Sequence, residues 1–434
     1  MTGSRATQVR PARALRGALR VPPDKSISHR YALLAALADG VTHIERYSTG
    51  ADCLSTLTCL ESLGIQVHRD HGSGGLTVAI IGRPHGFVAP VHEVDCGNSG
   101  TTMRLLSGLL ASQPFTATLI GDESLSGRPM RRVMAPLTAM GARFESQDGG
   151  RPPLRLTGGP LTGIVHTPEV PSAQIKSAVL LAGLRAAGAT AIVEPAATRD
   201  HTERALAAFG VTVDRSTPGQ LGVTGGATLT GGLRLRVPGD PSATAFLAVA
   251  AAGLEGSSID IDEVGLNPTR TALFDVLRRA GAAVTTTTTG TWHGEPVGQV
   301  HVETGARRAI TIAPDEVPLL IDELPALAAL ATFGGSIEVR GAGELRVKES
   351  DRITALVDGL RAMGADAHEY PDGFVVRGSR RLTGGAVDAR HDHRLAMAFA
   401  VAALGGDGPT LITGAEVAAV SFPGFFDTLD RLRV

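Results

Sequence analysis

The sequence contains six copies of one pattern of polar and apolar segments. Each copy begins with a short polar segment, continues as an apolar stretch rich in Ala and Leu, and ends in a short strand-like segment. The copies start at Asp24, Asn98, Ser172, Asp240, Asp322 and Asp392, which are 68 to 82 residues apart. A repeat of this length is typically one supersecondary unit that must bury its apolar face against its neighbours. The 434 residues therefore form six related units of about 72 residues each.

A second pattern lies between these copies. An amphipathic stretch ends at a glycine, and two short alternating segments follow around a Gly- or Asp-rich turn. The glycines are Gly64, Gly141, Gly210, Gly281 and Gly364. A glycine just after the last apolar residue indicates a helix C-cap, and alternating segments around such a turn predict a hairpin. Each unit is therefore predicted to be strand–helix–strand–helix–strand–strand, which makes the chain an α/β protein.

The last unit lacks its hairpin. The sequence ends at the sixth amphipathic stretch, whereas residues 6–22 predict two short strands that no unit has used. We expect these strands to complete the last unit. Six units group as two domains of three, and the similar segments VPPDKS and VPGDPS place the chain crossings near residues 22 and 239. The predicted domains are 23–238, and 1–22 together with 239–434.

Composition excludes several classes of protein. The 41 Lys and Arg nearly balance the 43 Asp and Glu, so bulk binding to nucleic acid or acidic membranes is not expected. Aromatic residues make up only 4%, which disfavours platforms for base stacking. The three cysteines form no CxxC pair, and no apolar run has the ~20 residues of a membrane span. No apolar signal segment stands at the N-terminus, so a cytoplasmic location is expected.

The apolar stretches must form the core of each domain. Segments such as AVLLAGL and AFAVAAL are apolar on every face, and such helices are buried on all sides. Three of them per domain would form a core wrapped by the sheets.

The polar starts of these helices are candidate anion sites, because helix N-termini offer free N–H groups and a positive dipole end. They hold many basic and hydroxyl side chains, and the chain has only three lysines, Lys25, Lys176 and Lys348, each in or near such a start. A cation in a first turn opposes the dipole and needs an anion nearby, which applies to Lys25, Arg30 and Arg394. Taken singly, Asn98, Ser172, Asp240 and Asp392 are better explained as helix caps.

Further arginines follow the strands of several units. Arg128, Arg199 and Arg352 stand at equivalent places, the last beside Lys348 and Glu349. Guanidinium groups suit phosphate and carboxylate oxygens, so the sequence predicts a ligand with several negative charges. The alternative is a set of ion pairs with Asp and Glu.

Two carboxylates stand among these bases. Asp322 opens the fifth apolar helix, where N–H groups and cations keep a carboxylate ionised, as a general base requires. Glu349 is a candidate proton relay. Asp322 is equally compatible with a role as helix cap alone.

Together these residues resemble the 5-enolpyruvylshikimate-3-phosphate synthase (3-phosphoshikimate 1-carboxyvinyltransferase) family, over essentially the whole chain. Eight motifs carry the resemblance in the family's order: DKSISHR at 24–30, GNSGTTMR at 97–104, GRPM at 127–130, SAQIKSA at 172–178, TRDHTE at 198–203, IDELP at 321–325, RVKESDR at 346–352 and DHR at 392–394. The SAQ-K and TRDHTE forms resemble a bacterial subclass rather than the enteric or plant type.

The resemblance implies two inside-out α/β domains, each of three βαβαββ repeats with pseudo-threefold symmetry, that close on two anionic substrates. The implied reaction transfers the enolpyruvyl group of phosphoenolpyruvate to the 5-hydroxyl of shikimate 3-phosphate and releases phosphate. The enzyme is expected to need no metal or organic cofactor and to be a monomer. Repeats 1–3 are expected to lie on the shikimate 3-phosphate side.

The same resemblance implies the site residues. Those implied to bind shikimate 3-phosphate are Lys25, Ser26, Arg30, Ser172, Ala173, Gln174, Arg199, Asp322 and Lys348. Those implied to bind phosphoenolpyruvate are Lys25, Gly100, Arg128, Gln174, Arg352 and Arg394. Asp322 would take the hydroxyl proton, and Glu349 and Lys25 are the candidates for delivering a proton to C3 of phosphoenolpyruvate.

Two positions bear on this resemblance. Val420 precedes Ser421 where enteric-type members have a Lys, so one phosphate contact is expected to be absent or replaced. Gly100 stands where tolerant members of the subclass carry Ala, so we expect sensitivity to glyphosate.

Two rival functions remain. One is the sister family of UDP-N-acetylglucosamine enolpyruvyl transferases, which use a loop cysteine that is missing from residues 121–130 here. Cys53, Cys59 and Cys96 are instead expected to be buried structural thiols. The other rival is a non-catalytic six-repeat scaffold.

Overall fold

The structure is a computed structural model that describes residues 6–379 and 381–434. The chain divides into two compact units. The discontinuous unit comprises Met1–Pro22, Pro238–Gly290 and Pro296–Val434, and the central unit comprises Pro23–Val237 and Thr291–Glu295. This division differs from the predicted domains at Pro238 and in the short segment Thr291–Glu295. The predicted boundaries remain our proposal for the two folding domains.

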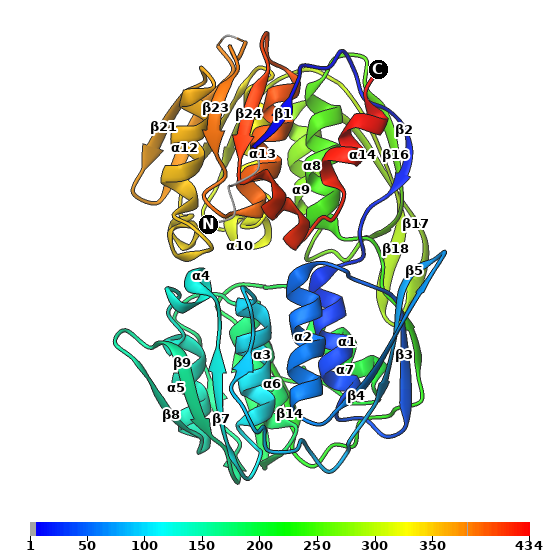
Figure 1. The fold of residues 1–434 in the computed structure, drawn as a ribbon, viewed down its shortest axis with the longest axis vertical. Coiled ribbons are helices and arrows are strands. Elements are labelled where there is room, and N and C mark those ends of the chain that lie inside the picture. The colour runs from blue at the N-terminus through cyan, green and yellow to red at the C-terminus, as the bar shows by residue number, and fades with distance from the viewer. Residues whose placement is uncertain (1–5, 380) are drawn as a thin grey trace. The chain divides into compact units, whose positions relative to one another are not determined.

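The central unit holds three repeats (Figure 1). Its helices are α1 (Lys25–Ala35), α2 (Ala51–Ser62), α3 (Gly100–Leu110), α4 (Glu123–Ser126), α5 (Arg131–Met140), α6 (Ala173–Gly183) and α7 (His201–Ala208). Its strands are β3 (Val41–Tyr47), β4 (Gln66–Gly72), β5 (Gly75–Ile81), β6 (Val94–Asp95), β7 (Thr116–Ile120), β8 (Arg143–Gln147), β9 (Arg151–Thr157), β10 (Leu161–Thr162), β11 (Val165–His166), β12 (Ala186–Ala187), β13 (Ala189–Val193), β14 (Gln220–Thr224) and β15 (Arg234–Arg236).

The discontinuous unit holds the other three repeats. Its helices are α8 (Pro241–Gly253), α9 (Ala272–Ala280), α10 (Val317–Leu320), α11 (Leu324–Ala331), η1 (Gly343–Val347), α12 (Arg352–Ala362), α13 (His393–Leu404), η2 (Ala415–Val420) and α14 (Phe425–Leu432). Its strands are β1 (Ala6–Val9), β2 (Arg16–Arg20), β16 (Ser258–Gly265), β17 (Ala283–Trp292), β18 (Glu295–Glu303), β19 (Ala309–Ile312), β20 (Ser336–Val339), β21 (Asp366–Tyr370), β22 (Gly373–Arg377), β23 (Gly385–Asp388) and β24 (Thr410–Thr413). The tip of the β17–β18 hairpin belongs to the central unit.

The sheets have the predicted repeat topology. In the order β6-β7-β9-β8, β6 pairs parallel with β7, and the hairpin β8–β9 pairs antiparallel through β9. The orders β19-β20-β22-β21, β17-β18-β16-β2 and β15-β3-β5-β4 follow the same plan. Since α3 connects β6 to β7 and α5 connects β7 to β8, the observed unit is βαβαββ, as the sequence predicts.

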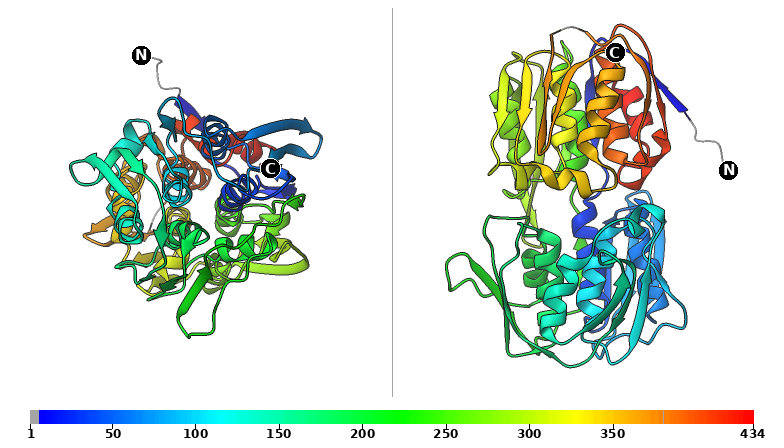
Figure 2. Two further views of the ribbon diagram at one scale, coloured as in Figure 1. Left: turned by 90° about the horizontal axis from the view of Figure 1, so that it is seen from below. Right: turned by 90° about the vertical axis from the view of Figure 1, so that its left-hand side faces the viewer.

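Fully buried helices form the core of each unit. Every residue of α8, α11 and α13 is buried, and most of α1, α3 and α6 is buried as well. Figure 2 shows the helices of each unit running side by side, with strands outside them. The helices α3 and α6 approach closely at Gly108, where a Cβ would lie 2.3 Å from the carbonyl oxygen of Ala178. This close approach accounts for a glycine inside an apolar helix.

The N-terminal strands do not both complete the last repeat. Strand β1 pairs antiparallel with β24 of the sixth repeat, from Ala6 opposite Thr413 to Val9 opposite Thr410, which confirms half of the prediction. Strand β2 instead pairs parallel with β16 of the fourth repeat, so that half was wrong. The reason is that β15, which precedes α8 in the sequence, pairs with β3 in the central unit. The edge of β16 is therefore open to a parallel strand, and β2 fills it.

Deleting residues 1–16, of which 1–5 lie outside the described residues, should destabilise the discontinuous unit. The deletion removes β1 and Leu15, whose side chain is fully buried. Loss of a buried Leu side chain alone costs about 2–5 kcal/mol of unfolding free energy. Denaturant unfolding would measure this loss, with Arg10→Ser at an exposed position as the control. A truncated chain with unchanged unfolding would contradict the role of these strands.

None of the helices within residues 6–379 and 381–434 is long and apolar enough to span a membrane.

Candidate active site

Three helices of the central unit that carry predicted site residues, α1, α3 and α6, begin at a side-chain cap. The cap oxygen accepts a hydrogen bond from a backbone N–H two or three residues into the helix, which fixes the first turn. These bonds join Asp24 to Ile27 at 3.0 Å, Ser99 to Thr102 at 3.1 Å and Ser172 to Ile175 at 3.4 Å. Ser172 is thus the predicted cap, but the cap of α3 is Ser99 rather than Asn98. Asn98 instead donates to Asp122 and accepts from Arg128.

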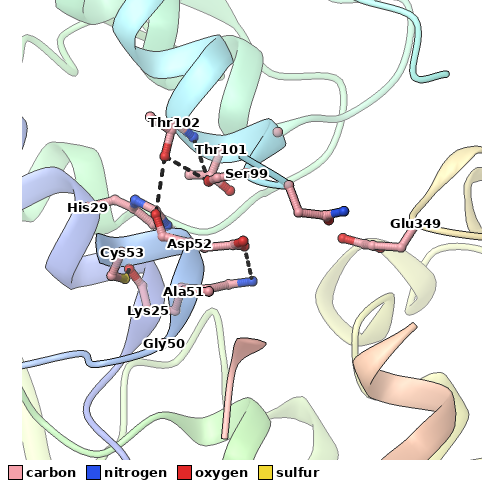
Figure 3. Close-up of polar contacts among 12 residues, drawn as sticks. Lys25, His29, Gly50, Ala51, Asp52, Cys53, Ser99, Thr101, Thr102 and Glu349 are labelled. Atoms are coloured by element: carbon pink, nitrogen blue, oxygen red, sulfur yellow. Dashed lines mark hydrogen bonds and ion pairs between the residues drawn. The ribbon is translucent and has the colours of Figure 1, made fainter. Parts of the chain in front are cut away.

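Lys25 forms a shielded ion pair with Asp52. The lysine is the first residue of α1, and its Nζ lies 3.1 Å from Oδ2 of Asp52 in the first turn of α2 (Figure 3). Both side chains are largely buried, with exposed fractions of 16% and 8%. The start of α2 stabilises the carboxylate through its dipole. Sequence reasoning missed Asp52, because an acid in a first turn is an ordinary helix feature.

A chain of hydrogen bonds lies behind this pair. His29 Nδ1 lies 2.6 Å from Thr56 Oγ1, Thr56 lies 2.7 Å from Thr102, and Thr102 donates to Ser99 at 2.7 Å. Burial, with the charges of Lys25 and Arg30, lowers the pKa of the His29 imidazole well below its ordinary value. His29 is therefore neutral at pH 7, and the chain ties α1 and α2 to the start of α3. Figure 3 shows the last part of it, where Thr102 contacts Ser99 and the backbone oxygen of Asp52.

Arg30 is a buried cation that hydroxyl groups hold in place. It donates to Thr202 Oγ1 at 2.6 Å, to Ser177 Oγ at 2.8 Å and to the carbonyl oxygen of Ser26 at 2.8 Å. Burial lowers the pKa of the Arg30 guanidinium to about 10, although the charge of Glu203 acts in the opposite direction. The charge of Arg199 contributes to the lowering, so this arginine lies near enough to act on Arg30.

Gly100 lies against two guanidinium groups. A Cβ at this first residue of α3 would lie 2.8 Å from Arg104 Nη1 and 3.4 Å from Arg128 Nη1. Arg104 donates to Gln174 at 2.7 Å, and Gln174 donates to Thr101 at 2.9 Å. The predicted residues Gly100, Arg128 and Gln174 are thus brought together, and Arg104 is a neighbour that sequence reasoning did not assign. Arg128 is itself buried and donates to Asn98 at 2.6 Å.

In the discontinuous unit, Asp322 faces two arginines. Its Oδ1 lies 3.7 Å from Arg352 Nη1, and its Oδ2 lies 3.5 Å from Arg394 Nη2. Its backbone oxygen also accepts from Arg394 at 2.8 Å. The helix α11 begins after Glu323 and has no side-chain cap, so Asp322 is not a helix cap. The structure therefore removes the cap alternative and leaves the carboxylate directed at cations.

Arg352 is the most enclosed cation of this group. It is 1% exposed, donates to Asp392 at 2.7 Å and also pairs with Glu349. Burial acts to lower its pKa, but the carboxylates of Asp392, Glu349 and Asp322 outweigh burial and raise the pKa above its ordinary value. Asp392 is also the cap of α13, as predicted, through a hydrogen bond from the backbone N–H of Arg394 at 2.9 Å.

The segment that carries Lys348 and Glu349 is fixed by Arg346. This arginine donates to Asp351 at 2.7 Å, to Glu369 at 2.9 Å and to the carbonyl oxygen of Pro371 at 2.7 Å. It thereby joins η1 and the start of α12 to the β21–β22 hairpin. Arg346 and Asp351 lie inside the motif RVKESDR, but Glu369 and Pro371 come from a hairpin that no motif includes.

The cysteines are buried, as expected. Burial raises the pKa of the Cys53 thiol, so it is a poor nucleophile at pH 7. A hydrogen bond with Cys59, together with burial, raises the pKa of Cys96. Among the described residues, no group of three or more His, Cys, Asp or Glu side chains is arranged to hold a metal ion.

Each unit thus gathers a set of cations around backbone N–H groups or a carboxylate. The central unit contains Lys25, Ser26, Arg30, Gly100, Arg128, Ser172, Ala173, Gln174 and Arg199, and the discontinuous unit contains Asp322, Lys348, Glu349, Arg352 and Arg394. Such groups can bind phosphate and carboxylate oxygens, and Asp322 can accept a proton.

Known proteins share this fold and much of this sequence. The family model described as EPSP synthase (3-phosphoshikimate 1-carboxyvinyltransferase) matches residues 9–429. The 3-phosphoshikimate 1-carboxyvinyltransferase of Solibacter usitatus is 46% identical over 427 residues, covering 98% of this chain and 99% of that protein. The protein of the same name from Nitrosococcus oceani is 49% identical over 422 residues, covering 96% of this chain and 94% of that protein.

Solved structures agree with these relatives. EPSP synthase from Acinetobacter baumannii superposes with a TM-score of 0.85 at 41% identity, covering 99% of this chain and 98% of that chain. The enolpyruvyl transferase NikO from Streptomyces tendae superposes with a TM-score of 0.77 at 18% identity over 99% and 98% of the two chains, and shares the fold. The chain therefore belongs to the EPSP synthase family, the 3-phosphoshikimate 1-carboxyvinyltransferases, and has the α/β fold of enolpyruvyl transferases.

Proposed function

We propose that the residues described above transfer the enolpyruvyl group of phosphoenolpyruvate to the 5-hydroxyl of shikimate 3-phosphate, with release of phosphate. This is a step of the shikimate pathway, which leads to the aromatic amino acids. The observation that carries the proposal is the position of Asp322, whose carboxylate lies 3.7 Å from Arg352 and 3.5 Å from Arg394. A base beside two phosphate-binding cations suits a reaction between a hydroxyl group and an anionic donor.

Shikimate 3-phosphate is the first proposed ligand. Its proposed binding residues are Lys25, Ser26, Arg30, Ser172, Ala173, Gln174, Arg199, Asp322 and Lys348. Support comes from Arg30, a desolvated guanidinium, and from the capped start of α6, whose N–H groups favour an anion. The phosphate group requires such donors, and the ring hydroxyls suit carboxylate and amide partners.

Phosphoenolpyruvate is the second proposed ligand. Its proposed binding residues are Lys25, Gly100, Arg128, Gln174, Arg352 and Arg394. The donor carries a carboxylate and a phosphate, so it needs several cations. Gly100 supports this assignment, because its missing side chain lets the guanidinium groups of Arg104 and Arg128 lie close to the N-terminus of α3.

The proposed chemistry has two stages. The 5-hydroxyl oxygen adds to C2 of phosphoenolpyruvate while Asp322 takes its proton, and Glu349 or Lys25 delivers a proton to C3. The tetrahedral intermediate then loses a proton from C3, the bond from C2 to the phosphate oxygen breaks, and phosphate leaves. When phosphoenolpyruvate engages Arg352 and Arg394, the ion pairs of Asp322 with these arginines weaken. The carboxylate thereby becomes a stronger base as the donor binds.

The test is phosphate release from phosphoenolpyruvate by the purified chain, with a chelator present. The acceptor is either shikimate 3-phosphate or UDP-N-acetylglucosamine. We expect release only with shikimate 3-phosphate. Release only with the nucleotide sugar would favour the sister family, and no release with either would favour a scaffold.

Gly100→Ala should weaken inhibition by glyphosate, which we expect to compete with phosphoenolpyruvate in the unmodified chain at micromolar concentrations. The new methyl group would lie 2.8 Å from Arg104 and force this side chain to move. Overpacking typically costs about 1–3 kcal/mol, which corresponds to about a 5- to 150-fold change in the inhibition constant. Gly159→Ala is the matched control, because nothing lies within 4 Å of its added Cβ. Millimolar tolerance in the unmodified chain would contradict this account of Gly100.

We further propose that the enzyme is a cytoplasmic monomer. The small anionic substrates of the shikimate pathway support the proposed location. Analytical ultracentrifugation at several concentrations would test the monomer, and a mass of twice 44.7 kDa would contradict it.

A further inference from the structure

The mechanism above does not use Lys176, one of the three lysines of the chain. Its side chain is 1% exposed in helix α6 of the central unit. Its Nζ lies 2.9 Å from Oε1 of Glu194 and 2.8 Å from Oε1 of Glu203. Ammonium groups are almost never fully buried unless carboxylates pair with them. The pair Lys176–Glu203 joins the motifs SAQIKSA and TRDHTE, which mark the subclass in the sequence.

The neighbours of this pair hold Arg30. Ser177 follows Lys176 and accepts from Arg30 at 2.8 Å, and Thr202 precedes Glu203 and accepts from Arg30 at 2.6 Å. The two hydroxyl groups also share a hydrogen bond of 2.6 Å. Arg30 is therefore held in place by the immediate sequence neighbours of Lys176 and Glu203.

Charge couples the pair to Arg30 as well. The negative charge of Glu203 acts directly on the Arg30 guanidinium, and Glu203 is 3% exposed, so solvent screens it weakly. Arg199 acts on Arg30 with the opposite sign. Without Lys176, only the exposed Arg215 at 3.7 Å would oppose the charge of Glu203, which would then repel an anion bound at Arg30.

We propose that Lys176 is a positioning residue that neutralises Glu203 and thereby keeps Arg30 available for the anionic acceptor substrate. The inference rests on the proposed function, in which Arg30 and Arg199 bind shikimate 3-phosphate. Lys176 itself touches no substrate in this account. Its effect is confined to acceptor binding and leaves the donor residues Gly100 and Arg128 unchanged.

The test is calorimetric binding of shikimate 3-phosphate, without phosphoenolpyruvate, to three variants of the full chain. Lys176→Met should raise the dissociation constant for shikimate 3-phosphate by about tenfold or more. This is the effect expected from losing about one charge-assisted hydrogen bond. The double variant Lys176→Met with Glu203→Gln removes the more buried of the two carboxylates and leaves Glu194, which is 17% exposed and accepts a hydrogen bond from Thr198. It should therefore restore binding to within about threefold of the unmodified chain. Glu203→Gln alone should bind at least as tightly as the unmodified chain.

Arg215→Met is the matched control. Arg215 lies 3.7 Å from the same Glu203 but is 55% exposed, so the same loss of charge should change binding by less than about threefold. Steady-state kinetics should show a higher KM for shikimate 3-phosphate in Lys176→Met, with the KM for phosphoenolpyruvate unchanged.

The outcomes separate the two proposals. If the unmodified chain does not bind shikimate 3-phosphate, the proposed function fails. If it binds, but the double variant is as weak as Lys176→Met, or Lys176→Met binds normally, the role of Lys176 is overturned. If Lys176→Met does not fold, the binding of shikimate 3-phosphate to Glu203→Gln is the test. Weaker binding to that variant than to the unmodified chain would contradict the role of Lys176.

Discussion

Asp322→Asn should lower kcat by about 10²–10⁴-fold, the usual contribution of a general base. The amide keeps the size of the side chain but cannot accept the proton of the 5-hydroxyl. It also removes the negative charge that lies 3.7 Å from Arg352 and 3.5 Å from Arg394, so phosphoenolpyruvate should bind no less tightly. Initial rates of phosphate release at saturating substrates measure kcat.

A loss of kcat with an unchanged KM for phosphoenolpyruvate would identify a base rather than a binding group. Asp315→Asn, at an exposed position on the segment before α10, is the control and should retain full activity. An Asp322→Asn variant with more than about one tenth of normal kcat would contradict the assignment.

Lys25→Met should lower kcat/KM for both substrates by about 10²–10⁴-fold. The reason is that the proposed mechanism has this ammonium group bind both ligands and take part in proton transfer. The variant also removes the ammonium group that lies 3.1 Å from the buried carboxylate of Asp52. Removing one partner of a buried pair is destabilising by about 3–5 kcal/mol, and the 16% exposure of Lys25 reduces this figure. The melting temperature should therefore fall as well.

A second variant separates the two effects. Lys25→Met with Asp52→Asn removes both charges, so it should recover most of the lost stability while kcat/KM stays low. Recovery of activity together with stability would show that Lys25 acts only through Asp52, and would contradict its contact with substrate.

Much of the fold follows from periodicity. The six apolar helices, the glycines that end the amphipathic helices and the hairpins are local patterns, and the four-stranded βαβαββ sheets confirm them. In the third repeat the hairpin prediction was only half right, because its sheet is β11-β13-β14 and a single bridge at Asp214 replaces the other hairpin strand. The pairing of β2 with β16 was not predictable in the same way, because it depends on β15 leaving its own repeat to pair with β3. Strand pairing across more than 200 residues has no local signal.

The candidate site shows the same limit. Lys25 and Arg30 were identifiable because a cation at a helix start opposes the helix dipole, and Asp322 was identifiable because it opens an apolar helix in a sequence with many basic motifs. Asp52, the partner of Lys25, was not, because an acid in a first turn is ordinary until the fold brings it within 3.1 Å of the ammonium group. Arg104 was not assigned either, because its hydrogen bond to Gln174 joins two helices that are far apart in the sequence. Asn98 was assigned to a cap because Asn and Ser are equally good there, and only backbone geometry selected Ser99.

The most direct test of the account is NMR of the products that the unmodified chain forms from shikimate 3-phosphate and phosphoenolpyruvate in D₂O. We predict equal amounts of inorganic phosphate and of an enolpyruvyl ether on the 5-oxygen, with deuterium in its methylene group, because C3 is first protonated and then deprotonated. Phosphate without the ether, or an ether on another hydroxyl, would contradict the central claim.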